Sequence, residues 1–134
     1  MLFFGVPPRF DTDNGTHIYT YAYATYNDHG AAFRGFNISD VLSLSHEVAE
    51  FLNDPFVGIL PNKVPTWSAN ALNSVVCSNL LEVGDPLPVV WFTANGYHLQ
   101  DEAFLPWFAR ESPSTSINGQ YTYLGTFTTF SKPC

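Results

Sequence analysis

Hydrophobic and polar residues alternate over residues 17–26, where Tyr19, Tyr21 and Tyr23 share one side of an extended chain. A period of two is typical of a β-strand that is buried through one face. We therefore predict a strand over residues 17–26. Residues 1–16 contain a Pro-Pro pair and an Asn-Gly pair, and we predict that they form an entry loop.

The pattern changes to helical spacing between residues 40 and 53. Ser39 or Asp40 is a suitable N-cap, and the helix should end at Asp54 because the residue before a proline avoids helical angles. Apolar side chains that recur every three or four residues are expected to form its buried stripe. These side chains are Val41, Leu44, Val48, Phe51 and Leu52.

The signals after this helix are less regular. Residues 56–88 are rich in proline and asparagine, which predicts a long loop of the kind that is usually functional. Apolar runs on either side of Asn95 and Gly96 predict a β-hairpin over residues 89–100.

Two further segments complete the predicted fold. Residues 101–110 are ambiguous because Pro106 would interrupt a helix, and residues 120–130 predict one or two strands. Together the segments predict a single α+β domain over residues 1–134, rich in loops. One central helix would pack on an antiparallel or mixed sheet.

The composition narrows the functional classes. Charged residues make up 13% of the chain and hydrophobic residues 46%, which excludes a disordered chain and a coiled coil. The net charge is −7, and the sequence lacks the basic surface that nucleic acids or anionic membranes require. No apolar run reaches the roughly 18 residues that a membrane span needs. The basic residues are scattered: Arg9, Arg34, Lys63, Arg110 and Lys132.

The two cysteines, Cys77 and Cys134, allow a single pairing. Few lysines, many aromatic and asparagine residues and a C-terminal cysteine favour a secreted protein with one disulfide. Two buried thiols are the alternative. A disulfide would close a loop of about 57 residues and would connect the C-terminus to the segment before Glu82.

The segment 45–50, Ser-His-Glu-Val-Ala-Glu, carries the clearest chemical signal. His46 and Glu50 are one helical turn apart, so both can bind one ion, and Glu47 can take a proton from an ion-bound water. The usual metal-hydrolase pattern is His-Glu-x-x-His. The carboxylate of Glu50 is a harder ligand, which leaves manganese, iron and calcium open beside zinc. A solvated helix face with clustered acids is the alternative.

A third ligand has to come from outside this helix. Glu82 and Asp85 are the first candidates. Gly84 allows a positive φ and hence a turn, and we favour Asp85 because this turn and Pro86 would hold its short side chain. Glu82 would then complete the site or support it from outside. His98 is the next candidate ligand and also a candidate for stabilising an oxyanion, and Asp101 is a further option.

These segments together resemble a family of secreted bacterial and fungal proteins that look like relatives of the zincin metallopeptidases. Its members carry a His-Glu-x-x-Glu helix followed by Asp-Pro, a tryptophan, a Glu-x-Gly-Asp segment and a Tyr-x-x-Gln strand. A broader likeness runs to plant and microbial phosphate-induced secreted proteins. The matching residues of this chain fall within about residues 39–134, at 46–50, 54–55, 67, 82–85 and 97–100.

The resemblance implies a zincin-like half-fold in which a strand lines the cleft and a loop returns a ligand to the helix. It assigns His46 and Glu50 as ligands, Glu47 as the base, and Glu82 or Asp85 as the downstream ligand. Members of the family are longer on the N-terminal side, which implies that this chain is the C-terminal core of a longer protein.

The sequence thus predicts a secreted metal-dependent hydrolase that uses a divalent ion, zinc first, and acts on a peptide or another polymer. The alternative is a non-catalytic secreted module in which the same acids hold a structural cation and an aromatic surface binds a polymer or a partner. The tryptophans that form that surface if exposed, and the core if buried, are Trp67, Trp91 and Trp107.

Overall fold

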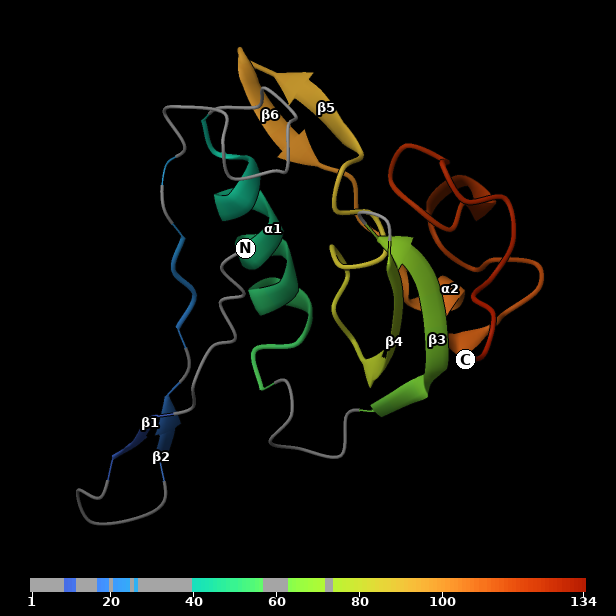
Figure 1. The fold of residues 1–134 in the computed structure, drawn as a ribbon, viewed down its shortest axis with the longest axis horizontal. Helices are drawn as coiled ribbons and strands as arrows, with labels where there is room; N and C mark the ends of the chain where they lie inside the picture. The colour runs from blue at the N-terminus through green and yellow to red at the C-terminus, as the bar shows by residue number, and fades with distance from the viewer. Residues whose placement is uncertain are drawn as a thin grey trace.

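A computed structural model describes residues 9–11, 17–19, 21–24, 26, 40–56, 63–71 and 74–134. Over these residues the chain has the predicted α+β class, with helices and two-stranded antiparallel pairs (Figure 1). The elements in chain order are β1 (Arg9–Asp11), β2 (His17–Tyr19), α1 (Leu42–Asn53), β3 (Lys63–Ala71), β4 (Ser74–Leu80), β5 (Trp91–Ala94), β6 (Tyr97–Gln100), α2 (Leu105–Ala109) and the 3-10 turn η2 (Ile117–Gly119).

The hairpin of β5 and β6 confirms the prediction for residues 89–100. Asn95 and Gly96 form its two-residue turn with φ values of 51° and 82°, the left-handed conformation that a type I′ turn requires. Thr93 pairs with His98, and Trp91 pairs with Gln100. His98 and Gln100 therefore lie on the same face of β6, and this face packs against α1.

A second hairpin, β3 and β4, occupies a segment that the sequence predicted to be a loop. Its strands pair from Ser78 opposite Trp67 to Ser74 opposite Ala71, and the register shifts between Lys63 and Trp67, where Pro65 lies. Proline cannot donate to a ladder and is tolerated at such an irregularity. Pro65 is thus accommodated at the irregular end of the ladder, whereas Asn70 and Asn79 lie within the strands.

Helix α1 confirms the predicted helix but not its buried face. The buried side chains are Leu42 and Ala49, whereas Leu44 and Val48 are each 40% exposed and Leu52 is 74% exposed. At 100° per residue, Leu44 and Val48 lie about 160° around the helix from His46. Because α1 turns His46 inward, the apolar residues opposite it face outward.

The predicted cap of this helix is also wrong. Val41 takes the N-cap position, and no side chain bonds to the first turn as a cap. The Asp40 carboxylate instead accepts hydrogen bonds from His98 on β6. Ser39 lies outside the described residues.

Three other predicted elements change. Of the strand predicted for residues 17–26, β2 is the part that forms a strand among the described residues. It pairs with β1, which lies within the predicted entry loop. Pro106 does not prevent a helix, because it lies in the first turn of α2, where no intrahelical donor is lost. Residues 120–130 form turns, and their bridge from Thr122 to Ala103 is isolated.

The core lies between the second hairpin, α2 and the C-terminal segment. Trp67 is fully buried, contacts Trp107 and Phe108 edge-to-face, and donates its indole N–H to the Leu80 carbonyl at 2.8 Å. The predicted disulfide is present: Cys77 and Cys134 are joined, and Lys132 pairs with Ser68 of β3. The C-terminal segment therefore runs beside β3 (Figure 1).

Candidate metal centre

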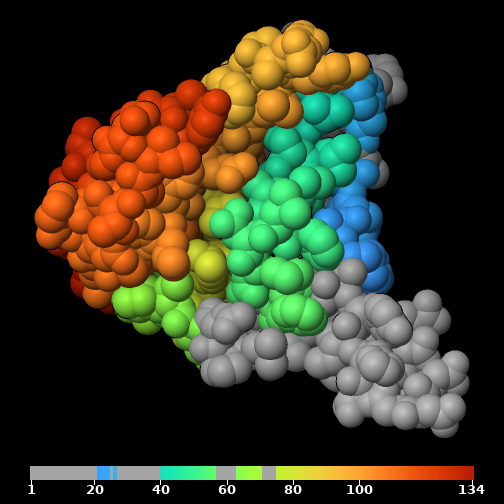
Figure 2. Space-filling model, turned by 180° about the vertical axis from the view of Figure 1, so that it is seen from behind, coloured from blue at the N-terminus to red at the C-terminus, as the bar shows by residue number. Residues whose placement is uncertain are grey.

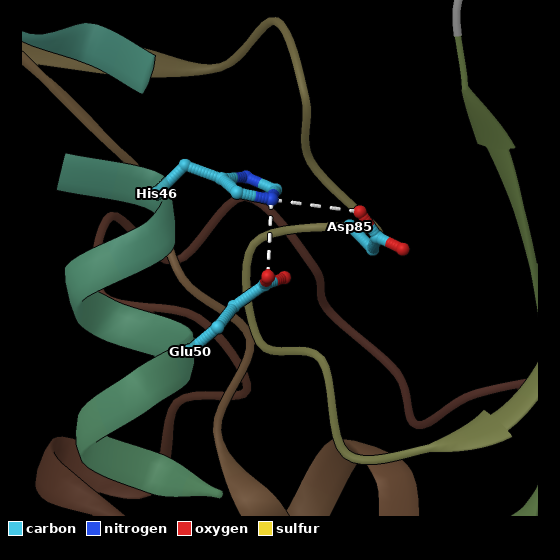
Figure 3. Close-up of side chains that lie close together, drawn as sticks. All are labelled: His46, Glu50 and Asp85. Atoms are coloured by element: carbon cyan, nitrogen blue, oxygen red, sulfur yellow. Dashed lines mark ion pairs between the residues drawn. The ribbon is translucent and has the colours of Figure 1, made fainter. Parts of the chain in front are cut away.

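Three potential ligand side chains meet between α1 and the loop of residues 81–90. His46 Nε2 lies 3.2 Å from Glu50 Oε2 and 3.6 Å from Asp85 Oδ1, and the three ligand atoms all lie within 4.8 Å of one another. Figure 3 shows His46 and Glu50 projecting from adjacent turns of α1 toward Asp85. We call these three residues the His46 cluster.

The separations within the His46 cluster fit a small cation. Zinc binds nitrogen and oxygen ligands at about 2.0–2.2 Å, so tetrahedral geometry places two ligand atoms about 3.4 Å apart. The observed distances of 3.2 and 3.6 Å bracket that value. The donor set of one imidazole and two carboxylates also suits manganese or iron, so geometry does not name the metal.

The cluster is sheltered but open to solvent. The side chains of His46, Glu50 and Asp85 are 18%, 17% and 27% exposed. In the space-filling view, the yellow segment that follows β4 is recessed between the green helix α1 and the orange and red C-terminal part (Figure 2). The three side chains are therefore partly accessible from solvent.

The loop reaches α1 through a turn, although its glycine acts differently from our expectation. The Leu87 N–H donates to the Gly84 carbonyl at 3.0 Å, so that Asp85 and Pro86 occupy the corner of the turn. Gly84 does not have the positive φ that we expected. Its lack of a side chain matters instead, since a Cβ there would lie 2.4 Å from His46 Nδ1.

The charges of the cluster strongly perturb its histidine. Burial alone would lower the pKa of His46, but the hydrogen bond and charge of Glu50, with the charges of Asp85 and Glu47, raise it to about 9. Without a metal, a proton on Nε2 therefore occupies the place between His46 and the carboxylates. A metal would have to displace this proton.

The surrounding carboxyls have raised pKa values. Burial and repulsion by Glu50 and Asp85 raise the pKa of Glu47 to about 7, although His46 opposes the shift. Burial and the neighbouring carboxylates, Asp85 foremost, raise the pKa of Glu82 to about 8. Burial, with the charge of Glu50, also raises the pKa of Asp85. One half-buried region thus concentrates like charges, and a cation would stabilise it.

Glu82 and Glu102 flank the cluster. Glu82 interacts with Asp85 but does not belong to the group of three ligand atoms, and its predicted role stays a prediction. Glu102, which we did not single out, has a pKa raised by burial and by the charges of Asp101 and Glu50.

Gln100 is a site residue that the sequence reasoning missed. Its side chain bridges His46 Nδ1, at 3.0 Å, and the Gly84 carbonyl, at 2.6 Å. The Tyr-x-x-Gln strand was visible in the sequence, but only the observed packing of β6 on α1 shows what this glutamine contacts.

His98 lies outside the His46 cluster and is paired with another acid. Its Nδ1 is 2.8 Å from Asp40 Oδ2, and its backbone N–H also donates to that carboxylate. These hydrogen bonds outweigh burial and lower the pKa of Asp40. His98 also contacts the edge of Trp91, at 6.3 Å between ring centroids. Its predicted catalytic role stays a prediction.

The remaining candidates have structural environments. Asp101 is fully buried, and its carboxylate is bonded to the C-terminal segment. Trp67 and Trp107 are buried in the core and cannot form a binding surface, whereas Trp91 is partly exposed.

Comparison with protein-family models, curated proteins and solved structures finds no match for this chain. The resemblance to zincin relatives therefore stays an expectation. In the described part of the chain, neither helix combines the length and hydrophobicity needed to cross a bilayer.

Proposed function

We propose that the protein is a metal-dependent hydrolase with peptidase-like chemistry, whose ion is held by His46, Glu50 and Asp85. The supporting observation is the approach of three ligand atoms to within 4.8 Å of one another, at separations that suit tetrahedral coordination. Zinc is the first choice for the ion. In this proposal the arrangement is zincin-like, because one helix carries two ligands and the base while a later loop returns the third ligand.

The residues around the cluster have distinct roles in this proposal. A divalent ion supplies Lewis acidity and lowers the pKa of a bound water. Glu47, half-buried beside His46, has a pKa of about 7, which suits a group that takes up and returns a proton near neutral pH. His98 is held through Nδ1 by Asp40, and it can donate from Nε2 to a substrate oxygen when its ring carries both protons.

The Cys77–Cys134 disulfide supports placing this activity in an oxidising compartment, and we propose that the protein is secreted. The substrate is proposed to be a peptide or another polymer carrying an amide or ester.

A non-catalytic module with a structural cation is the second candidate. The observation that favours it is the concentration of buried carboxyls around Asp85, which any bound cation would stabilise whether or not it takes part in a reaction. The burial of Trp67 and Trp107 removes most of the aromatic surface that this alternative would use.

The test separates metal binding from catalysis. Protein purified without a metal-affinity tag should contain about one equivalent of metal by mass spectrometry, and Glu50→Ala should contain little. Glu47→Gln should retain the metal but lose hydrolysis of a labelled peptide library by about 10²- to 10⁴-fold. Glu111→Gln, the same change away from the cluster, is the matched control.

Each outcome supports one candidate. Little metal in the parent protein, even after zinc is added, contradicts both. Full metal content with no hydrolysis by the parent protein favours the non-catalytic module.

A further inference from the structure

The His46 ring is connected to the loop of residues 81–90 through one buried side chain. Gln100 is only 4% exposed, and its amide lies 3.0 Å from His46 Nδ1 and 2.6 Å from the Gly84 carbonyl oxygen. The Gln100 amide and the Gly84 carbonyl are not ligands in the proposed site. Their positions nevertheless determine which ring nitrogen of His46 faces Glu50 and Asp85.

The orientation of the Gln100 amide follows from its backbone partner. A carbonyl oxygen can only accept, so the Gln100 atom that faces Gly84 has to be the amide nitrogen. The amide oxygen then faces His46 and can also only accept. His46 Nδ1 therefore carries a proton and donates it to Gln100, and Nε2 is the nitrogen directed at the two carboxylates.

The backbone on both sides holds this arrangement in place. The Gln100 N–H donates to Ser45 Oγ at 3.0 Å, and that hydroxyl donates to the Leu42 carbonyl at 2.7 Å, which attaches β6 to α1. Gly84 lets the loop approach the ring, because a Cβ there would lie 2.4 Å from His46 Nδ1 and 3.1 Å from Gln100 Nε2.

We infer that Gln100 is a positioning residue, which fixes the ring orientation of His46 and keeps a proton on Nδ1 so that Nε2 is presented to a metal ion. This inference rests on the proposed metal site and names a residue on which its affinity depends. Outer hydrogen-bond partners of this kind orient metal-binding histidines and make them more basic.

Removing the amide should change which proton the ring gives up when a metal binds. In Gln100→Met, which keeps the side-chain length, Nδ1–H loses its acceptor while Nε2–H still faces the Glu50 and Asp85 carboxylates. The ring should then retain the proton on Nε2, where a metal must bind. We expect zinc affinity to fall by about 10- to 100-fold. Gln120→Met, the same change at the other glutamine of the chain, is the matched control.

The decisive readout is the ring proton itself, in protein labelled with ¹⁵N-histidine and free of metal. At neutral pH the parent protein should show an Nδ1–H signal of His46 that exchanges slowly with water, identified by its loss in His46→Gln. Zinc should remove the Nε2–H signal and leave the Nδ1–H signal. Gln100→Met should lose the Nδ1–H signal, and Gln120→Met should keep it.

Failure of this inference differs from failure of the proposed function. A parent protein without a protected Nδ1–H overturns the inference whether or not metal binds. A Gln100→Met variant that loses this signal but binds zinc as tightly as the parent also overturns it. A parent protein that shows the signal but binds no metal overturns the proposed function instead.

A second variant covers the possibility that Gln100→Met does not fold. Gln100→Glu loses the donor to the Gly84 carbonyl but retains an oxygen acceptor for Nδ1–H. It should therefore keep the protected signal and bind zinc more tightly than Gln100→Met does. Loss of the signal in a folded Gln100→Glu protein contradicts the role of the acceptor.

Discussion

The carboxylates of Asp101 and Asp85 are both sheltered from solvent, but Asp101 is surrounded by hydrogen-bond donors and Asp85 by other acids. Asp101 is completely buried and accepts three hydrogen bonds, from the N–H groups of Glu102 and Leu124 and the hydroxyl of Thr126, at 2.8–3.0 Å. Its charge is therefore stabilised entirely by the protein, as a buried charge normally is.

Asp85 instead faces other acids. Its neighbours are Glu82 and Glu50, and the counter-charge beside them is the His46 imidazolium. Within the described residues, the basic side chains Lys63, Arg110 and Lys132 form no ion pair with these acids. The protein thus stabilises one buried carboxylate fully with its own donors, which supports the view that the His46 cluster is completed by a cation from solution.

The largest expected effect comes from removing the Cys77–Cys134 disulfide. This bond attaches β4 to the C-terminal segment, which also provides hydrogen bonds to Asp101. Replacing both cysteines by serine should lower the free energy of unfolding by about 4 kcal/mol, because the disulfide joins residues 57 apart in sequence. Since β4 runs directly into the loop with Asp85, zinc affinity should fall as well. Urea unfolding and zinc titration measure the two effects. An unchanged zinc affinity would show that the two regions are independent.

Asp101→Asn should be the most damaging single change among the carboxyls compared here. It leaves a buried backbone or hydroxyl donor without a charged acceptor, so we expect a loss of about 3 kcal/mol in the free energy of unfolding. Asp85→Asn in metal-free protein is the comparison, and it should cost little. Equal losses in the two variants would remove the contrast between the two sites.

Zinc should stabilise the protein through the His46 cluster alone. At a free zinc concentration of about 100 times the dissociation constant, the free energy of unfolding should rise by about 2.7 kcal/mol. Asp85→Asn should abolish most of this gain, and Glu82→Gln should reduce it less, because Glu82 supports Asp85 from outside. Thermal unfolding with and without zinc measures both. A larger effect of Glu82→Gln would make Glu82 the ligand.

The stability of metal-free protein should fall as pH rises. The pKa values of His46, Glu47, Glu82 and Asp85 are all raised, to about 9, 7 and 8 for the first three. A group with a raised pKa contributes stability below its unfolded value and loses it as pH passes its folded value. The fall should therefore run from about pH 4.5 to 9. Zinc should reverse the trend near neutral pH, since its ligands must be deprotonated.

The smallest effect isolates repulsion within the acidic region. Glu82→Gln removes one like charge and should raise the stability of metal-free protein at pH 9 by about 1 kcal/mol, after allowance for solvent screening. Glu111→Gln, away from the cluster, should leave it unchanged. Chemical unfolding in the presence of a chelator tests this, and a loss of stability in Glu82→Gln would contradict the repulsion.

Local signals predicted the elements whose structure is decided locally. Asn95 and Gly96 predicted the β5–β6 hairpin because few residue pairs suit its turn. The spacing of His46 and Glu50 predicted that their side chains meet, because α1 itself sets that distance. The approach of Asp85 was expected, but for a different reason, since the need for glycine at position 84 comes from a ring that belongs to α1.

Long-range packing decided the rest. The sequence of α1 offers two apolar sides, and only the position of β6 and the loop of residues 81–90 selects the one with Leu42 and Ala49. Pro65 suggested a loop, but the cross-strand pairs of Trp67 and its neighbours outweigh it. Gln100 and Asp40 each bond to a partner more than 50 residues away, which no local pattern specifies.

The placement of the tryptophans gives the protein two separate optical reporters. Trp67 and Trp107 lie 5.8 Å apart in the core, and the Cys134 sulfur is 3.0 Å from the carbonyl oxygen of Trp67. A disulfide quenches the emission of a nearby excited indole, so the fluorescence of these two rings should rise when Cys77–Cys134 is reduced. Trp91 lies instead against His98, on the hairpin of β5 and β6. Emission from Trp91 should therefore report on the edge of the site rather than on the disulfide.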